Sequence, residues 1–224
     1  LKVPIGVIDT SWGGTRIEPW TPQVGFSGIP ALVDVVREIE AEGVKYHELQ
    51  AQTLKEYEKW IPQARTSLEA RKPIPAAPAW PPHHPLQSHQ RPTGLYNGMI
   101  HPLVPFAIRG AIWYQGESNH QDGMRYHEMM KALIGGWRQV WGQGDFPFYY
   151  VQLAPYSQTP LYSDDQLPKI WEAQTASLSI PNTGMAVTTD ITDLNDIHPK
   201  NKQDVGKRLA LWALARDYGF KDIV

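Results

Sequence analysis

The 224-residue sequence contains no cysteine, which excludes disulfide bonds, thiolate metal sites and a cysteine nucleophile. It also lacks an excess of charge of either sign: the net charge is −2, so no strong field directs the chain to nucleic acid or to an acidic membrane surface. No apolar run approaches the ~18 residues of a membrane span, and no stretch has the pattern of a signal peptide. With 42% hydrophobic and 20% charged residues, the composition is that of a globular domain with a substantial core.

Aromatic residues, in contrast, are plentiful, with nine Trp and ten Tyr. Such an excess suits a sugar-binding cleft. Core and surface packing uses the same large rings, and packing is the interpretation that we favour for most of them.

Four short segments rich in β-branched and aromatic residues predict buried strands, at residues 4–9, 108–115, 146–153 and 184–189. Several are apolar on both faces, which is typical of parallel strands covered by helices. Helical periodicity predicts helices around and between them. These helices are expected at residues 32–39, 46–68, 126–141, 171–178 and 202–218, with Gly43 ending the first and Gly142 the third.

Strands that alternate with helices predict an α/β fold with a mostly parallel sheet, here as a single domain over residues 1–224. Ligands of such sheets bind at the carboxyl ends of the strands. The polar residues that follow the predicted strands are therefore the candidates for chemistry.

Residues 72–92 interrupt this alternation with seven prolines and three histidines. Because proline is excluded from helix interiors and central strands, we predict an extended surface excursion. His83, His84 and His89 could suggest a metal, but the excursion offers no nearby carboxylate or cysteine, so we predict no metal site there.

Two adjacent glycines, Gly13 and Gly14, follow the first predicted strand. A glycine pair lets the backbone turn tightly and present bare N–H groups, which can hold a developing oxyanion. The alternative is a simple turn. Ser11, just before the pair, is either a nucleophile or a residue that hydrogen-bonds within that turn.

Gln115, Gly116 and Glu117 follow the second predicted strand. The amide can donate to an oxyanion, and the carboxylate can orient a histidine. The alternative is a polar turn in which Ser118 caps a helix.

His198 follows the fourth predicted strand, and it lies just ahead of Pro199 and a predicted helix. A histidine is a good general base because its ordinary pKa lies close to neutrality. The nearby carboxylates of Asp190, Asp193 and Asp196 could orient it. A surface histidine and a helix cap are alternatives, and a calcium site is disfavoured because the spacing does not match an EF-hand loop.

Together the three strand ends supply oxyanion donors, a base and an orienting acid, which is the machinery of acyl transfer through a serine. A non-catalytic carbohydrate-binding domain, supported by the aromatic residues, is the alternative from another class. A lipase or phosphodiesterase is disfavoured, because the sequence has no Gly-x-Ser-x-Gly motif and no clustered His and Asp metal set.

Four stretches resemble the sialate O-acetylesterase family of SGNH hydrolases, to which acetylxylan esterases with a His-Gln-Gly-Glu motif are related: PIGVIDTSWGGTRIEPW, YNGMIHPLVPFAIRGAIWYQGESN, WGQGDFPFYYVQLA and NDIHPKNKQDVGKRLALWALA. The resemblance covers nearly the whole chain. It implies a flavodoxin-like, three-layer α/β/α sandwich and removal of O-acetyl groups from sugars without a metal or cofactor. It also implies an acetylated sugar or oligosaccharide as substrate and favours a periplasmic or extracellular location.

The resemblance implies oxyanion-hole roles for the first two strand ends. Gly13 and Gly14 match the family motif that provides a backbone N–H, and Gln115 matches the position that provides a side-chain amide. The motif is Tyr-Gln-Gly-Glu here, where the acetylxylan esterases have His-Gln-Gly-Glu. Asn119, which closes this motif, is assigned with Gln115 to oxyanion or substrate binding.

The resemblance also implies that His198 is the catalytic base. The family often has an aspartate three residues before this histidine, a position that Asn195 occupies in this chain. Asp196 is therefore our first choice for the orienting acid. Glu117 is the second, because the related acetylxylan esterases use the glutamate of that motif.

The nucleophile is the largest departure from the family pattern. The family serine lies in a Gly-Gln-Ser-Asn motif on the first strand, and this sequence has no such motif. Since the family places that motif upstream of residue 4, we expect the chain to be the C-terminal portion of the enzyme, without the first strand and inactive or nearly inactive alone. Ser11 falls in the turn motif, where the backbone matters more than the hydroxyl, and Ser118 is a weaker candidate still.

Overall fold

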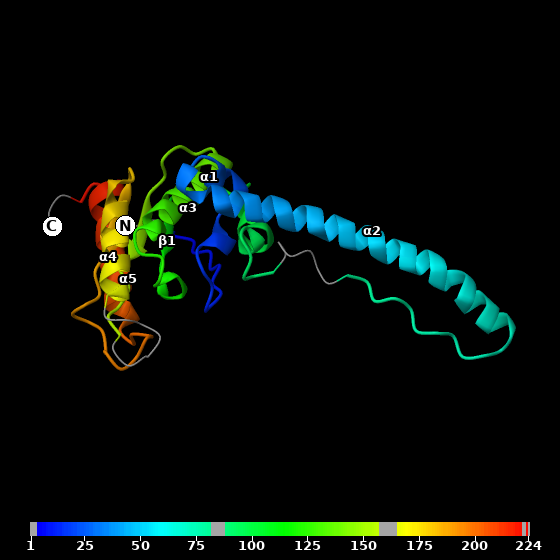
Figure 1. The fold of residues 1–224 in the computed structure, drawn as a ribbon. Coiled ribbons are helices and arrows are strands. Elements are labelled where there is room, and N and C mark those ends of the chain that lie inside the picture. Colours follow the sequence, from blue (N-terminus) through cyan, green and yellow to red (C-terminus); the bar gives the residue numbers. More distant parts are fainter. Residues whose placement is uncertain (1–3, 82–87, 157–164, 221–222, 224) are drawn as a thin grey trace.

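The computed structural model describes residues 4–81, 88–156, 165–220 and 223, and its body is an α/β fold from which one long helix projects (Figure 1). The sheet contains β1 (Ala111–Trp113), β2 (Phe148–Val151) and β3 (Thr183–Ala186), in the order β1-β2-β3. Both pairs of strands are parallel, with Trp113 opposite Tyr150 and Tyr150 opposite Met185. Three of the four predicted strands are therefore confirmed, each shorter than predicted.

Helices cover both faces of this sheet. Along the buried strand β2, Phe148 and Tyr150 point to the face of α3 (Arg125–Trp141) and α4 (Gln166–Ala176). Tyr149 and Val151 point to the opposite face, which α5 (Lys202–Asp217) covers. The alternation of side chains along a strand thus places a hydrophobic core on each face, and the three-layer α/β/α architecture is confirmed.

Several short elements connect the layers. The remaining α-helices are α1 (Gln23–Ser27) and α2 (Val33–Glu69). The single-turn 3-10 and π-helices are η1 (Glu18–Trp20), η2 (Pro30–Leu32), η4 (Tyr96–Ile100), η5 (His101–Leu103), η6 (Glu117–Asn119) and η7 (Ser177–Ser179).

Tryptophans fill the larger core, in agreement with the packing interpretation of the aromatic residues. The Trp113 ring meets Trp20 at 6.1 Å and Trp137 at 6.3 Å between centroids, both nearly perpendicular. The Trp137 indole also donates a hydrogen bond to Trp20 O over 2.9 Å. Edge-to-face geometry of this kind stabilises a pair of rings beyond the area that it buries.

Residues 4–9 do not form the predicted strand. They are extended but exposed, with Ile5 at 66% and Val7 at 83% of full exposure. The outer edge of β1 is open as well, and Ile112 is 69% exposed there. A strand requires a neighbour to satisfy its backbone and to cover its side chains, and none lies beside residues 4–9 in the part of the chain that the structure describes.

Gly43 does not end a helix, because α2 runs through it as one helix where two were predicted. A lone glycine destabilises a helix by about 1 kcal/mol relative to alanine, and the residues that follow it are mostly strong helix formers. In α3, by contrast, the Gly135-Gly136 pair has a packing reason. An added Cβ on Gly136 would lie 2.7 Å from Pro22, so only glycine permits this contact with the start of α1. Gly142, at φ +63°, ends α3 as predicted.

Residues 72–81 run extended and without regular structure, as predicted for the proline-rich excursion. His83 and His84 lie outside the described residues, and the His89 ring stacks on Trp12 with 4.8 Å between centroids. Among the residues described, no group of three metal-ligating side chains is found. No described helix is both long enough and apolar enough to span a membrane.

Candidate functional site

The Gly13-Gly14 turn packs against the residues that follow β1, so the first two predicted stretches do come together. The Gln115 amide donates to Thr15 O over 3.0 Å, and the Ile17 N–H donates to Asn119 Oδ1 over 2.9 Å. The Arg16 guanidinium reaches Ser118 O over 2.9 Å. Three hydrogen bonds between groups a hundred residues apart fix the turn at the carboxyl end of β1, which is where the ligands of parallel sheets bind.

The turn itself is open. Gly13 and Gly14 are exposed, and a Cβ added to either would meet nothing within 4 Å. Gly14 has a φ of +73°, a conformation that favours glycine. Neither N–H donates a hydrogen bond to any group within the described part of the chain. The turn therefore presents backbone donors that an anionic oxygen could accept.

Gln115, in contrast, has its hydrogen-bonding groups engaged. Besides its bond to Thr15 O, its Nε2 donates to Asn119 Oδ1 over 2.8 Å, and its Oε1 accepts from the Tyr126 hydroxyl over 3.0 Å. Both amide hydrogens are thus used within the protein. In this arrangement Gln115 holds the turn against the strand end and has no hydrogen left for an oxyanion.

Asn119 is also fully engaged, and its side chain is completely buried. Its Oδ1 accepts from Ile17 N and Gln115 Nε2, while its Nδ2 donates to Glu18 over 3.1 Å and to Asp122 over 2.8 Å. A buried amide with all four bonds made fixes its neighbours in place. The structure therefore gives Asn119 a supporting position beneath the turn, away from direct contact with a ligand.

Arg16 completes this network, and we name Arg16, Glu18, Asn119 and Asp122 the Arg16 cluster. The guanidinium lies 2.8 Å from Glu18 and 2.7 Å from Asp122. Burial lowers the pKa of Arg16, but its hydrogen bonds and charge interactions with the two carboxylates outweigh burial and raise the pKa overall. Our sequence analysis missed Arg16, Glu18 and Asp122. The signal was present as charged residues beside both motifs, in TRIEP and ESNHQD.

Glu117 connects the second stretch to the third. Burial raises the pKa of its carboxyl group, and the charges of His198 and Lys202 oppose that rise, which places both cations within electrostatic reach of the carboxylate. The Lys202 ammonium in turn lies 4.6 Å from the ring centroid of Tyr114. His198 and the first residue of α5 therefore approach the end of β1, as predicted.

Tyr114 occupies the position that is histidine in the related acetylxylan esterases. Its hydroxyl oxygen is buried and has no hydrogen-bond partner among the described residues. Burial, followed by the charge of Glu117, raises the pKa of Tyr114 to about 12, so the phenol stays protonated and can only add a neutral donor to the site.

His198 itself is exposed, and its ring has no hydrogen bond within the described residues. Asp196, the first choice for the orienting acid, accepts from the backbone N–H of His198 over 2.9 Å. The other carboxylates of this loop have different partners: Asp193 accepts from the backbone of Asn195 over 2.9 Å, and Asp190 pairs with Arg208. Asp196 thus shapes the backbone of the loop, while Glu117 is the carboxylate on which the charge of His198 acts.

The serines do not supply a nucleophile in this arrangement. Ser11 is exposed and its hydroxyl donates to Asp9. A serine–histidine hydrogen bond does exist between Ser177 and His127, with 3.0 Å between Oγ and Nδ1, but Ser177 is fully buried and its hydroxyl donates to Ala173 O. No described serine hydroxyl is hydrogen-bonded to His198.

Open backbone donors, a carboxylate and an accessible imidazole therefore lie around the carboxyl end of one parallel sheet, as in α/β/α-sandwich hydrolases. The sequence profile of the family described as "Carbohydrate esterase, sialic acid-specific acetylesterase" matches residues 83–215, more than half of the chain. The chain belongs to this family.

Similar proteins agree with the family. The chain is 35% identical to the sialate O-acetylesterase of Rattus norvegicus and 33% identical to that of Homo sapiens, in each case over 100% of its own length. A crystal structure of a carbohydrate acetylesterase from Xanthomonas citri superposes with a TM-score of 0.54 at 45% identity over 59% of the chain. The chain spans only 41% of the rat protein, 38% of the human protein and 31% of the Xanthomonas chain.

Proposed function

We propose that this chain forms part of a carbohydrate O-acetylesterase and supplies its base, its acid and its backbone oxyanion donors. The observation that carries the proposal is the meeting of three strand ends: the open Gly13-Gly14 turn is bonded to Gln115, and Glu117 lies within electrostatic reach of His198. Family membership supports ester hydrolysis on an acetylated sugar.

In the proposed mechanism, a serine hydroxyl attacks the acetyl carbonyl and His198 takes its proton. The carbonyl oxygen becomes an oxyanion that accepts from the N–H groups of Gly13 and Gly14. His198 then passes the proton to the sugar oxygen as the ester C–O bond breaks. Water attacks the acetyl-serine with His198 as base, which releases acetate and restores the serine.

The orienting acid in this proposal is Glu117, which reverses our first choice from the sequence. The carboxylate of Asp196 is used on the backbone N–H of His198, whereas that of Glu117 feels the charge of the ring. A partly buried carboxylate stabilises a neighbouring imidazolium more strongly than an exposed one, because water screens it less.

The serine in this proposal comes from outside these 224 residues, on a strand that pairs with the open edge of β1. Two features support it: Ile112 is exposed along that edge, and the apolar residues 4–9 have no sheet neighbour among the described residues. A strand inserted between them would cover both.

The test is the variant His198→Ala in the whole enzyme, measured as hydrolysis of p-nitrophenyl acetate. Loss of a general base predicts a fall in kcat/KM of about 10²- to 10⁴-fold. His47→Ala, on the exposed surface of α2, is the matched control and is expected to leave the rate unchanged. Unchanged turnover in His198→Ala would remove this histidine from the mechanism. Sugar binding without any hydrolysis by the whole enzyme would favour the carbohydrate-binding alternative.

A further inference from the structure

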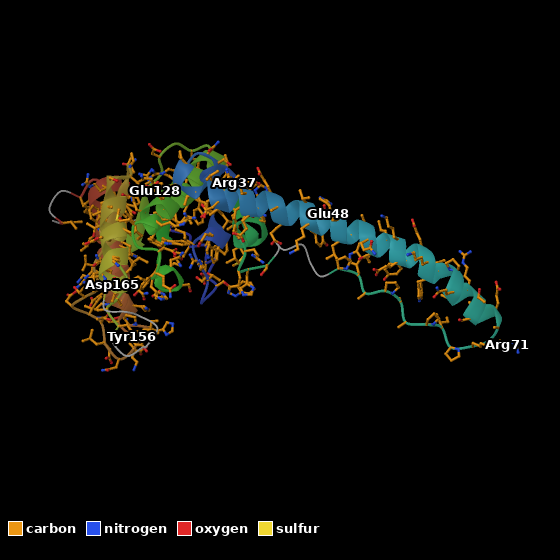
Figure 2. All side chains as sticks on the ribbon, viewed as in Figure 1. Arg37, Glu48, Arg71, Glu128, Tyr156 and Asp165 are labelled. Carbon is orange, nitrogen blue, oxygen red and sulfur yellow. The ribbon has the colours of Figure 1, made fainter. Side chains whose placement is uncertain are left out.

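The long helix α2 builds an arm that leaves the body of the protein. Figure 2 shows Arg37 beside the body, Glu48 farther along the helix and Arg71 at the far tip. Residues 72–81 then run back beneath the helix (Figure 1). This return segment covers one face of α2, where the Trp60 indole donates to Pro75 O over 2.9 Å and the Tyr57 ring lies 6.2 Å from Trp80.

An adjacent stripe of the helix is left uncovered. Leu54, Ile61 and Leu68 are 52%, 43% and 65% exposed, and they recur at every seventh residue. Seven residues are close to two helical turns, so the three side chains lie in one row. Regularly spaced apolar side chains that a protein leaves exposed indicate an interaction surface more strongly than scattered ones do.

Two charged residues flank this stripe on the same side. Glu58 and Arg65 are exposed and also lie seven residues apart, and neither forms an ion pair with any residue that the structure describes. An apolar row with one acid and one base beside it contains both halves of a complementary surface.

We propose that the stripe binds the same stripe of a second copy of this chain, with the two helices antiparallel about a two-fold axis at Ile61. In a two-fold interface, whatever one copy contributes the other contributes in reverse order. Leu54 lies seven residues before Ile61 and Leu68 seven residues after it, so each leucine faces the other leucine of the second copy. Ile61 faces its own counterpart at the axis.

The charges distinguish this arrangement from its competitors. Glu58 precedes the axis by three residues and Arg65 follows it by four, so each carboxylate comes within about one residue's rise, ~1.5 Å, of standing opposite a guanidinium. In a parallel pair, Glu58 would face Glu58 and Arg65 would face Arg65. The spacing thus favours the antiparallel pair and disfavours the parallel one.

The direct test is sedimentation of the purified chain over a range of concentrations. A reversible monomer–dimer equilibrium is expected. Ile61→Glu places two like charges at the axis and is expected to raise the dissociation constant by more than about 10-fold. Val44→Glu is the matched control: Val44 is 60% exposed on the same helix but lies outside the row, so its substitution should leave the equilibrium unchanged. Circular dichroism verifies that each variant keeps its helix content.

A charge exchange provides the second test. Glu58→Arg or Arg65→Glu alone replaces both symmetry-related attractions by repulsions, and each is expected to weaken the dimer by roughly 10-fold. The double variant Glu58→Arg/Arg65→Glu restores opposite charges and should return the dissociation constant close to that of the parent. A monomer at every concentration would overturn the proposal, as would a dimer indifferent to Ile61→Glu or a double variant no better than the single ones.

The whole enzyme provides a further check, which is independent of its esterase activity. If it is monomeric and the α2 amides around Ile61 are protected from hydrogen exchange, another part of the same polypeptide covers the stripe and the proposal is wrong.

Discussion

The two sides of the candidate site are built in opposite ways. On the side of the Gly13-Gly14 turn, the Arg16 cluster is buried or half-buried and Asn119 has no hydrogen-bonding capacity left. On the other side, His198 is exposed and its loop is held by short contacts from Asp196 and Asp193 to neighbouring backbone. The difference indicates a division of labour: the oxyanion side is preorganised by a satisfied network, whereas the base keeps freedom to turn.

The largest effect is expected from removing the centre of the preorganised side. Asn119→Ala leaves the Ile17 N–H, the Gln115 amide and two carboxylates short of a partner. Unsatisfied buried groups of this kind predict a loss of about 2–4 kcal/mol in the free energy of unfolding, measured by urea denaturation. Ser118→Ala next to it, whose neighbours use only its backbone, should change stability by less than about 0.5 kcal/mol. Equal effects of the two substitutions would show that the cluster is not a stabilising centre.

The turn that this cluster supports should respond more weakly. Gly14→Ala meets no steric clash, but it forces an L-residue to φ +73°, which predicts a loss of about 1–2 kcal/mol. Gly13→Ala is the matched control, because Gly13 is equally open and its φ is not positive. Thermal unfolding of the two variants separates them. A Gly13→Ala variant less stable than Gly14→Ala would contradict the conformation described for this turn.

The smallest and most conditional effect concerns the carboxyl group between the two sides. Burial raises the pKa of Glu117, so the folded state keeps this proton to a higher pH than the unfolded state does. The contribution of Glu117 to stability therefore falls as the pH rises above the ordinary range of a glutamate, by about 1.4 kcal/mol per pKa unit of difference, and it levels off above the raised pKa.

Glu117→Gln removes this titration. Urea midpoints measured between acid and neutral pH should then fall less steeply than in the parent, with the variant relatively more stable at neutral pH. Glu48→Gln on the exposed arm is the control and should reproduce the parent profile. A parent profile that rises through the same range would give the shift the opposite sign.

The same contrast explains what the sequence could predict. Residues 108–115, 146–153 and 184–189 are apolar because helices cover both faces of a parallel strand, so local composition was sufficient to find β1, β2 and β3. Residues 4–9 have the same composition without the sheet neighbour, and composition cannot show whether a neighbour exists. The exact ends of the strands also depend on pairing, which is why all three were predicted too long.

The candidate site was predictable to a similar extent. Gly13, Glu117 and His198 follow predicted strand ends, and parallel topology brings such ends together. The engagement of Gln115 and Asn119 could not be predicted, because their partners Thr15 and Ile17 lie about a hundred residues away in the sequence. The continuity of α2 through Gly43 was missed because a single glycine is only a weak stop signal.

The most direct measurement of the central claim is a double-mutant cycle in kcat/KM for acetyl ester hydrolysis by the whole enzyme, with His198→Ala, Glu117→Gln and both together. If the two residues act as one catalytic unit, the double variant is about as slow as His198→Ala alone. If the two losses multiply, Glu117 does not act through His198, and the assignment of this pair as base and orienting acid is wrong.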